Sequence, residues 1–465
     1  MWFRQDLRLS DNPALNAAVA AGNIMPIYIL DDVNSGKWSS GSASRVWLHH
    51  SLQALNDSLD GHLQLFRGDA RIVLRKLTHQ SPVKAVYWNR CYEPWRIHRD
   101  QKIKIQLNEQ GIEVKSFNAS LLWEPWQINK SDGTPYKVFT PFYQKGCLSA
   151  PPPRIPQPGP TRIKYADQAS PQSCKLVDLA LLPDQDWQKN IIEHWQFGEK
   201  AALIRLDKFC DQGLNDYRQG RDFPALDSTS RLSPYLHTGE ISPNQVWYRM
   251  DQESNRIQSS DTTHYQRELV WREFSYHLLY RFPELPEQNL NSKFDKFEWM
   301  QNQDQIKHWH RGLTGYPIVD AGMRELWQTG YMHNRVRMIV ASFLIKNMLV
   351  HWREGCRWFW DCLVDADLAN NSASWQWCAG SGADAAPYFR IFNPVLQSKK
   401  FDPDGEYIAR YVPELADLAP EKRHEPWLSL PEPKKLSDSD CGYPRPILDL
   451  KETRARALSR YQRLS

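Results

Sequence analysis

Several features that the sequence lacks exclude whole classes of protein. No run of about 18 apolar residues occurs in the 465-residue chain, so we expect no membrane-spanning helix. The first residues, Met1 to Asp6, carry charge at once, which argues against an apolar secretion signal. The eight cysteines stand singly and form no C-x-x-C pair. This spacing argues against a disulfide framework or a zinc site and fits a reducing cytoplasm.

Strong charge and a dinucleotide fingerprint are also missing. The net charge is only +4 at neutral pH, which neither requires nor excludes a nucleic-acid partner, because a local basic patch matters more than the total. No G-x-G-x-x-G follows any predicted strand, so a standard dinucleotide site in the N-terminal part is unsupported. Tryptophan is abundant instead, with 20 residues. We expect most of them in the core and a minority in stacking or electron relay.

The first 120 residues alternate between strand and helix patterns. Continuous apolar runs such as Ile24–Leu30 are typical of strands buried on both faces. The predicted strands are 24–30, 63–66, 83–88 and 112–117, and the predicted helices are 42–59 and 96–110. This alternation predicts a parallel, doubly wound sheet.

The remaining chain divides at a proline-rich segment. Residues 150–160 contain six prolines, which predicts an extended linker, and linker character continues to about Pro183. Helical patterns dominate from Gln196 onward. The length also favours more than one domain. We therefore predict an α/β domain at 1–122, a linker at 123–195 and a helical domain at 196–465.

Two predicted helices carry polar faces. In the segment 268–277, Glu268, Trp271, Arg272 and Ser275 recur at helical spacing, so one face carries a carboxyl, an indole and a guanidinium. Such a face could protonate, stack on and hold an aromatic, anionic ligand, or it could be an ordinary ion-paired helix surface. The segment 331–338 opens an apolar stretch, which predicts a largely buried helix whose arginines need partners. It could form a salt-bridge network or line a ligand pocket.

Two predicted turns are rich in polar groups. In the segment 229–236, hydroxyls surround Arg231, and Ser233-Pro234 predicts a helix N-cap with proline at the first position. This start could seat a phosphate or be an ordinary cap. The segment 365–371 has two carboxylates followed by two amides, which is typical of a capped polar loop. A metal site is not predicted there, because no third ligand pattern appears.

Taken together and in order, these segments resemble the photolyase and cryptochrome family over essentially the whole chain, and the class I cyclobutane pyrimidine dimer photolyases most of all. The densest likeness lies in 2–9, Thr-Gly-Tyr-Pro-Ile-Val-Asp at 314–320, Met-His-Asn-Arg at 332–335, Trp-Arg-Glu-Gly at 352–355 and the run 365–393. The resemblance implies a Rossmann-like α/β antenna domain with a parallel sheet, a long linker and an all-helical FAD-binding domain. Relatives carry more apolar residues before the first Trp, so we expect a short first strand here.

The resemblance also implies the cofactors. FAD is expected to bind without a covalent bond and to be reduced in the active form. The implied cofactor-binding residues are Tyr217, Thr229, Ser230, Arg231, Leu232, Ser233, Arg337, Asp365, Ala366, Asp367 and Asn371. Arg337 is expected to pair with Asp365, and the Asn371 amide to face flavin N5. Residues 92–96 lack the Asn-Glu pair of folate-binding relatives, so a folate antenna, a deazaflavin antenna or none remain open.

On the substrate side, the resemblance implies a pocket for a flipped dimer, which is poorly stacked and therefore costs less to extrude than a normal pair. The implied DNA and dimer residues are Arg221, Glu268, Trp271, Asn334, Arg335, Met338, Trp377 and Gln397. The indoles would stack, the arginines would hold phosphate, and a protonated Glu268 would donate to a thymine carbonyl. Trp375, Trp352 and Trp299 match the family's electron relay, and Asn371 and Glu268 complete the expected catalytic set.

The implied function is light-driven repair of cyclobutane pyrimidine dimers in DNA by a deoxyribodipyrimidine photolyase, through electron transfer to the dimer with no net redox change. We expect a monomer without an obligate protein partner, a membrane or a metal, acting in the cytoplasm at the nucleoid. A cryptochrome photoreceptor and repair of the (6-4) photoproduct are the alternatives. Relatives that repair the (6-4) photoproduct use a histidine pair, and only His333 stands in that segment.

Overall fold

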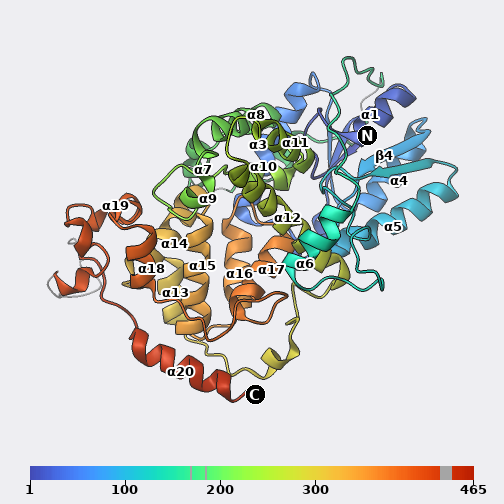
Figure 1. Cartoon of the computed structure of the whole chain (residues 1–465). Helices are drawn as coiled ribbons and strands as arrows, with labels where there is room; N and C mark the ends of the chain where they lie inside the picture. Colours follow the sequence, from blue (N-terminus) through green and yellow to red (C-terminus); the bar gives the residue numbers. More distant parts are fainter. Residues whose placement is uncertain (168–169, 184–185, 430–441, 465) are drawn as a thin grey trace. The chain divides into compact units, whose positions relative to one another are not determined.

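Five parallel strands form one sheet in the N-terminal part of the chain. The computed structural model describes residues 1–167, 170–183, 186–429 and 442–464. The strands are β1 (Trp2–Phe3), β2 (Ile27–Leu30), β3 (Gln64–Arg67), β4 (Ala85–Asn89) and β5 (Glu113–Phe117), in the order β3-β2-β1-β4-β5 (Figure 1). The predicted parallel sheet is confirmed. The short β1 lies at its centre and pairs with both β2 and β4.

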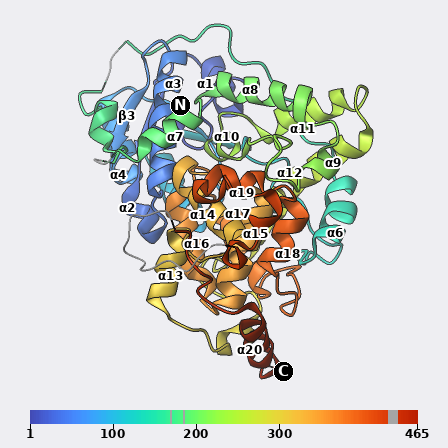
Figure 2. The same cartoon turned by 90° about the vertical axis from the view of Figure 1, so that its left-hand side faces the viewer.

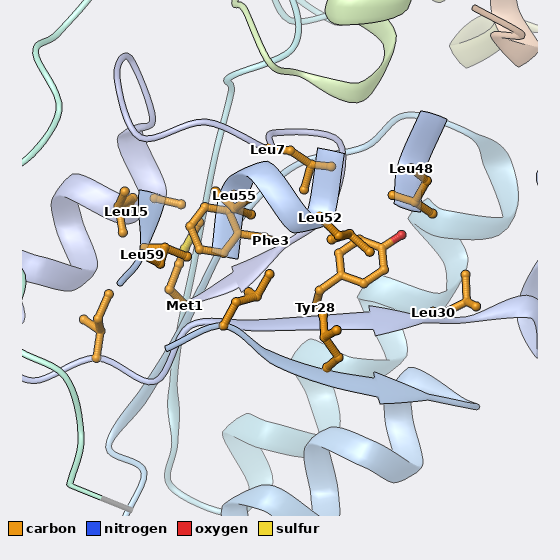
Figure 3. Packing of buried hydrophobic residues seen from close by; sticks show 14 of the residues in the cluster. Met1, Phe3, Leu7, Leu15, Tyr28, Leu30, Leu48, Leu52, Leu55 and Leu59 are labelled. Carbon is orange, nitrogen blue, oxygen red and sulfur yellow. The ribbon is translucent and has the colours of Figure 1, made fainter. Parts of the chain in front are cut away.

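Successive strand residues bury their side chains on opposite faces of the sheet, as the pleat requires. Phe3, Tyr28 and Leu30 lie in one hydrophobic cluster with residues of α1 (Pro13–Ala21) and α3 (Ser42–Ser58), as Figure 3 shows. Trp2 and Ile29 lie in a second cluster with residues of α4 (Ala70–Gln80) and α5 (Pro94–Glu109). Burial on both faces explains why the strands read as continuous apolar runs.

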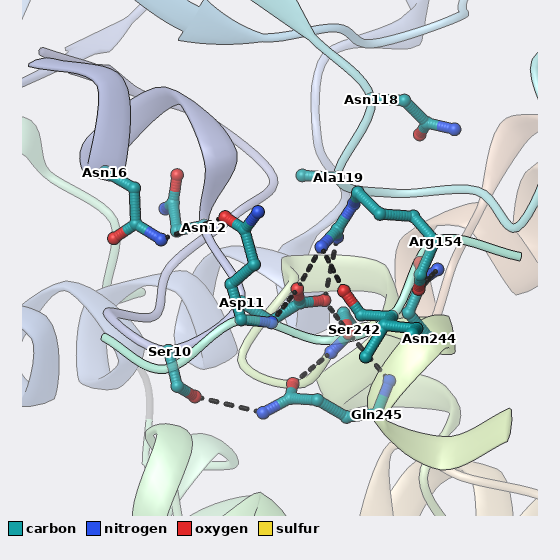
Figure 4. A network of polar contacts seen from close by, with 12 residues as sticks. Ser10, Asp11, Asn12, Asn16, Asn118, Ala119, Arg154, Ser242, Asn244 and Gln245 are labelled. Atoms are coloured by element: carbon teal, nitrogen blue, oxygen red, sulfur yellow. Dashed lines mark hydrogen bonds and ion pairs between the residues drawn. The ribbon is translucent and has the colours of Figure 1, made fainter. Parts of the chain in front are cut away.

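The proline-rich segment 151–160 forms neither helix nor strand, as predicted, and polar contacts fix it in place. Arg154 pairs with the fully buried Asp11, with 2.9 Å between Nη2 and Oδ2. The Ser242 hydroxyl donates to the same carboxylate at 2.5 Å, and Asn244 donates to the Arg154 carbonyl at 2.6 Å (Figure 4). Since Ser242 caps α11 (Pro243–Glu253), the linker is tied both to the turn before α1 and to a helix that follows it.

The described residues fall into two compact units, which do not follow the predicted domain boundaries; those boundaries stay a prediction. The first unit contains residues 1–215, 230–283 and 364–370. Besides the sheet and its helices, it contains α2 (Asp32–Ser35), α6 (Phe139–Pro141), α7 (Gln188–His194), α8 (Glu199–Lys208), α10 (Ser233–Thr238), α11 and α12 (Ser259–Arg281). The second unit contains residues 216–229, 284–363 and 371–465.

The second unit is helical. Its helices are α9 (Tyr217–Gly220), α13 (Gln303–His310), α14 (Pro317–Thr329), α15 (Asn334–Ser342), α16 (Trp352–Cys362), α18 (Pro394–Phe401), α19 (Glu406–Tyr411) and α20 (Leu450–Gln462), and α17 (Leu368–Ala379) contributes all but its first three residues. Figures 1 and 2 show α14 and α15 side by side. Within the described ranges, no helix has the length and apolar character needed to cross a membrane.

The motif at 314–320 anchors the C-terminal part of the second unit. The fully buried Asp320 carboxylate accepts from the backbone N–H of Thr314 at 2.7 Å, from that of Gly315 at 2.9 Å and from the Tyr443 hydroxyl. Gly315 has a φ of +78°, and a Cβ there would lie 2.4 Å from the backbone of Arg445. The motif therefore has a structural task, and its glycine is required by both backbone conformation and space.

Candidate active site

Two carboxylates at the start of α17 form the polar centre of the first unit. Asp365 and Asp367 are both buried. Ser233 donates to Asp365 at 2.5 Å, and Tyr276 donates to Asp367. The Asn370 backbone N–H donates to Asp367 at 2.8 Å, so Asp367 caps α17, and the prediction of a capped polar segment is confirmed. The structure thus brings together the serine and the aspartates that sequence reasoning assigned to one cofactor.

A cationic and hydroxyl environment holds Asp367 ionised. His237 lies in α10, with 3.5 Å between its Nδ1 and Oδ2 of Asp367. Burial by itself would raise the pKa of this carboxyl, but the hydrogen bond and charge of His237, together with Arg272 and Tyr276, outweigh burial and lower the pKa to about 2. Sequence reasoning missed His237 and Tyr276. The spacing of four residues between Ser233 and His237 was the available signal, since it places both on one helix face.

The predicted cap at the start of α10 is wrong. The N-cap position is occupied by Leu232, no side chain caps this end, and Pro234 lies in the first turn. Ser233 is the first residue of the helix rather than its cap, and its hydroxyl donates to Asp365. Arg231 has a φ of +51°, an uncommon backbone conformation for a residue with a side chain. Ser230 accepts from the Tyr265 hydroxyl at 2.8 Å.

The carboxyl, indole and guanidinium that the spacing places on one face of α12 have separate partners. Trp271 is half-buried and stacks on Phe139, with 3.7 Å between ring centroids and 5° between planes. Arg272 instead donates to the Ser120 carbonyl at 2.6 Å and lies over the Tyr276 ring. The Glu268 side chain is about one-third exposed, and its Oε1 lies 4.0 Å from Nε2 of His264. Spacing on one helix face therefore does not give these three groups a common partner among the contacts above.

The adjacent Glu273 is an ionisable group that sequence reasoning did not single out, and its Oε1 lies 3.5 Å from Nη1 of Arg272. It is buried and accepts from the backbone N–H of Leu122 at 2.9 Å and of Trp123 at 3.2 Å. Burial raises the pKa of the Glu273 carboxyl to about 7, although Arg272 and the two backbone donors act in the opposite direction. Its task is to hold the segment after β5 against α12.

In the second unit, α15 carries four of the predicted residues, but it differs from the expected helix. The helix begins at Asn334, and His333 caps it by accepting from the backbone N–H of Arg335. Most of this helix is buried, as predicted, but Asn334 is exposed and Arg335, Arg337 and Met338 are half-buried. The polar side chains of the first turn thus reach the surface, while Val336 in the same turn is fully buried.

The arginines of α15 have partners within the second unit. Arg335 pairs with Asp222 at 2.7 Å, and Arg337 donates through Nε to the Met332 carbonyl at 2.7 Å. The predicted pair between Arg337 and Asp365 would join residues of different units and stays a prediction. The other predicted residues of this unit range from buried to half-buried: Tyr217 is buried, and Arg221, Thr229, Trp377 and Gln397 are half-buried.

Asn371 lies in α17 and is buried. Its amide NH₂ group donates to the Cys356 carbonyl at 2.9 Å and contacts the Cys356 sulfur at 3.3 Å. This contact with α16 fixes the Asn371 amide in one orientation, because its NH₂ group is hydrogen-bonded to Cys356.

The three relay tryptophans differ in exposure. Trp352 is fully buried, Trp375 is buried and Trp299 is half-buried. The Trp375 indole packs on α16 at Gly355, one turn after Trp352, and a Cβ at that glycine would lie 2.0 Å from the indole. The His351 ring contacts both other tryptophans. Its centroid lies 5.1 Å from that of Trp299 and 5.5 Å from that of Trp352. Burial, with Arg353 and Arg357 adding, lowers the pKa of His351 to about 4, so this ring is neutral at pH 7.

The residue types fit the expected cofactor. The hydroxyls and the guanidinium at 229–233 can donate hydrogen bonds to a diphosphate. The two buried carboxylates, which protein donors hold in place, can accept hydrogen bonds from the hydroxyl and N–H groups of a flavin nucleotide. Leu232 and Ala366 are buried apolar residues of the same two segments. Within the described ranges, no group of three His, Cys, Asp or Glu side chains is placed to hold a metal ion.

Comparison with known proteins identifies the family. Residues 1–160 match the profile of DNA photolyase, and residues 265–463 match the FAD binding domain of DNA photolyase. The deoxyribodipyrimidine photo-lyase of Agrobacterium fabrum is 48% identical, with 99% of this chain and 97% of that protein aligned. The chain belongs to the photolyase and cryptochrome family. Cryptochrome-2 of Arabidopsis thaliana is 38% identical over 99% of this chain and 78% of its own length.

A solved family structure supports the same assignment. A bacterial class III photolyase from Agrobacterium tumefaciens superposes with a TM-score of 0.93 at 48% identity, covering 100% of this chain and 96% of that one. The predicted family, fold class, enzyme class and FAD-binding domain are thereby confirmed. The lesion, the site residues and a second chromophore stay predictions, and the predicted class I differs from the class of this photolyase relative.

Proposed function

We propose that this photolyase family member repairs cyclobutane pyrimidine dimers in DNA under blue light. The observation that carries the proposal is the rigid indole of Trp271, stacked on Phe139 at 3.7 Å and half-buried one helical turn from Glu268. A fixed aromatic plane next to a carboxyl suits a flipped-out pyrimidine dimer, which can stack and presents carbonyl oxygens. We assign the chain to class III rather than class I, in line with the solved photolyase relative.

Each substrate residue has a proposed task. Trp271 and Trp377 stack on the flipped dimer, which spares it contact with water. Glu268, when protonated, donates to a thymine carbonyl and stabilises negative charge that develops there. Asn334, Met338 and Gln397 line the dimer site, and Arg221 and Arg335 contact the phosphates that flank it.

The cofactor residues hold FAD without a covalent bond. When bound in its reduced form, FAD supplies the light-excited electron that splitting of the dimer requires. Ser230, Arg231 and Thr229 hold its phosphates, and Asp365 and Asp367 accept from its hydroxyl and N–H groups. The Asn371 NH₂ group is used by Cys356, which supports turning its amide oxygen toward a flavin N–H.

The relay residues connect the site with the surface. We assign electron transfer to Trp375, Trp352 and Trp299, in order of increasing distance from the cofactor. The half-buried end of the series at Trp299 and the neutral His351 ring between Trp299 and Trp352 support this order. Indoles are easily oxidised, so a spaced series can restore the reduced cofactor.

The state of His333 favours the cyclobutane lesion over the (6-4) photoproduct. This histidine is buried, and its Nδ1 accepts from the backbone N–H of Arg335 as the cap of α15. A ring used in this way is poorly placed for acid–base chemistry on a lesion. The single histidine of the segment therefore has a structural task.

The test compares two lesions and two substitutions. FAD-loaded, reduced protein should repair a duplex with one cyclobutane thymine dimer and leave a (6-4) photoproduct unchanged. Trp271→Ala should weaken binding of the dimer duplex by about tenfold, and Trp271→Phe, which keeps an aromatic plane, should weaken it less. Repair of the (6-4) lesion instead, or a light-responsive flavin with repair of neither lesion, would move the assignment to the (6-4) or cryptochrome alternative.

A further inference from the structure

Arg335 is held in a cluster within the second unit that also contains an acidic residue. Its Nη2 lies 2.7 Å from Oδ1 of Asp222, its Cζ lies 4.4 Å from the Phe401 ring centroid, and its Nη1 lies 3.7 Å from the Met338 sulfur. The Arg335 side chain is 19% exposed and that of Asp222 is 33% exposed. The guanidinium is thus fixed by one ring face, one carboxylate and one sulfur.

The ion pair changes what Arg335 presents to DNA. The ion pair of a guanidinium and a carboxylate carries no net charge. It therefore attracts a phosphate less than an isolated arginine does. Asp222 is the more exposed partner, so an approaching phosphate also meets its negative charge. Partly exposed ion pairs of this kind contribute little to the free energy of folding. The pair can therefore open when a ligand supplies further contacts.

The pair also connects the phosphate contact with the dimer site. Met338 and Arg335 lie on the same helix, three residues apart, and their side chains touch. Arg335 can therefore respond to occupancy of the pocket that we assign to Met338. An undamaged duplex offers its phosphates without placing a base at that pocket.

We propose that Asp222 is a specificity-determining residue, which neutralises Arg335 toward undamaged DNA and releases it when a flipped dimer occupies the adjacent site. This inference rests on the proposed function, because it requires the dimer pocket. Asp222 would act by withholding one phosphate contact from undamaged DNA, not by touching the lesion.

The experiment measures binding of one duplex with and without a single thymine dimer, using the full FAD-loaded chain at several salt concentrations. Asp222→Asn removes the charge and keeps the shape. We expect it to strengthen binding of the undamaged duplex about threefold to tenfold. The slope of log K against log salt concentration should become steeper by about one, and the preference for the damaged duplex should fall. Flavin content identifies folded variants.

Two further variants sharpen the test. Glu354→Gln removes the same charge from an exposed pair on α16, where Glu354 lies 3.0 Å from Arg357, and it should leave the preference for damage unchanged. In the Arg335→Met background, Asp222→Asn should have no effect on the undamaged duplex, because the two residues act through one contact.

The possible results separate the two proposals. Equal effects of Asp222→Asn and Glu354→Gln, or an unchanged affinity and salt dependence in Asp222→Asn, would overturn the role of Asp222 alone. A wild-type protein with no preference for the dimer duplex would instead contradict the proposed function.

Discussion

Two buried carboxyls on or near α12 have pKa values shifted in opposite directions. Asp367, at the start of α17, faces an imidazole, a phenol and a guanidinium, and its pKa falls to about 2. Glu273 is as deeply buried, and its closest donors are two backbone N–H groups; its pKa rises to about 7. Burial acts in the same direction on both, so the difference arises from the partners.

This difference distinguishes the carboxyl that we assign to the cofactor from one with a structural task. With a pKa of about 2, Asp367 is ionised at neutral pH, which suits a residue assigned to donors of a cofactor. Glu273 changes protonation near neutral pH, and its partners are two backbone N–H groups and the Arg272 guanidinium, whose Nη1 lies 3.5 Å from Oε1. The two carboxyls should therefore respond to pH in opposite directions, and substitutions at each should expose that difference.

The largest effect is expected for Asp367→Ala. Its removal leaves the Tyr276 hydroxyl and the His237 imidazole without their carboxylate, which should lower the free energy of unfolding by about 3 to 5 kcal/mol. Urea unfolding at pH 7 measures this loss. Asp304→Ala, which removes an exposed carboxylate at a surface pair, serves as the control and should cost less than about 1 kcal/mol. Equal losses in both variants would contradict a special role for Asp367.

The next effect concerns Glu273 and pH. Because the pKa is raised from 4.5 to about 7 in the folded protein, the stability that this carboxyl contributes is full below pH 4.5 and is lost as pH rises through 7. The loss amounts to roughly 3 kcal/mol. Glu273→Gln should abolish this part of the pH dependence, as urea unfolding at pH 5, 6 and 7 would show. An identical pH slope in the two proteins would mean that Glu273 is ionised throughout.

A smaller effect is expected for Tyr276→Phe. The variant loses one hydrogen bond to a charged carboxylate, worth about 1.5 to 3 kcal/mol. The lowered pKa of Asp367 stabilises the fold above about pH 4, and this stability is lost as pH falls toward 2. With one donor fewer, acid unfolding should begin at higher pH. An unchanged acid transition would show that His237 and the Asn370 backbone suffice.

The smallest effect is expected for Ser233→Ala, which removes the hydroxyl that donates to Asp365. We expect a loss of about 1 kcal/mol in stability and a modest weakening of FAD binding. Ser233→Thr keeps the hydroxyl and should retain most of the stability and most of the affinity for FAD. Fluorescence titration with FAD measures the affinity, and a larger loss in the Thr variant than in the Ala variant would contradict the hydrogen-bond account.

The sheet could be predicted from the sequence because its signal is local. Runs such as Ile27–Leu30 alternate between two apolar faces, and each face meets helices that are close in sequence. The helical spacing of α12 was equally readable. By contrast, Asp320 and Tyr443 lie more than one hundred positions apart, and no local pattern indicates their contact.

The errors in the site have a common physical cause. Ser233 was expected to cap its own helix, but a carboxylate 132 positions away accepts its hydroxyl. Arg272 was grouped with Trp271 by spacing, whereas its partner is the Ser120 carbonyl, 152 positions away. Spacing along one helix shows which side chains share a face, and tertiary partners decide which of them act together.

The most direct test of the central claim is repair under light and in darkness. Reduced, FAD-loaded protein would be mixed with an oligonucleotide that carries one cyclobutane thymine dimer, and intact thymines would be counted after blue light and after an equal time in the dark. We predict repair in the light and none in the dark, with pre-reduced Trp375→Phe protein repairing as well as the wild type. Absence of repair in the light, with the flavin bound and reduced, would contradict the proposed function.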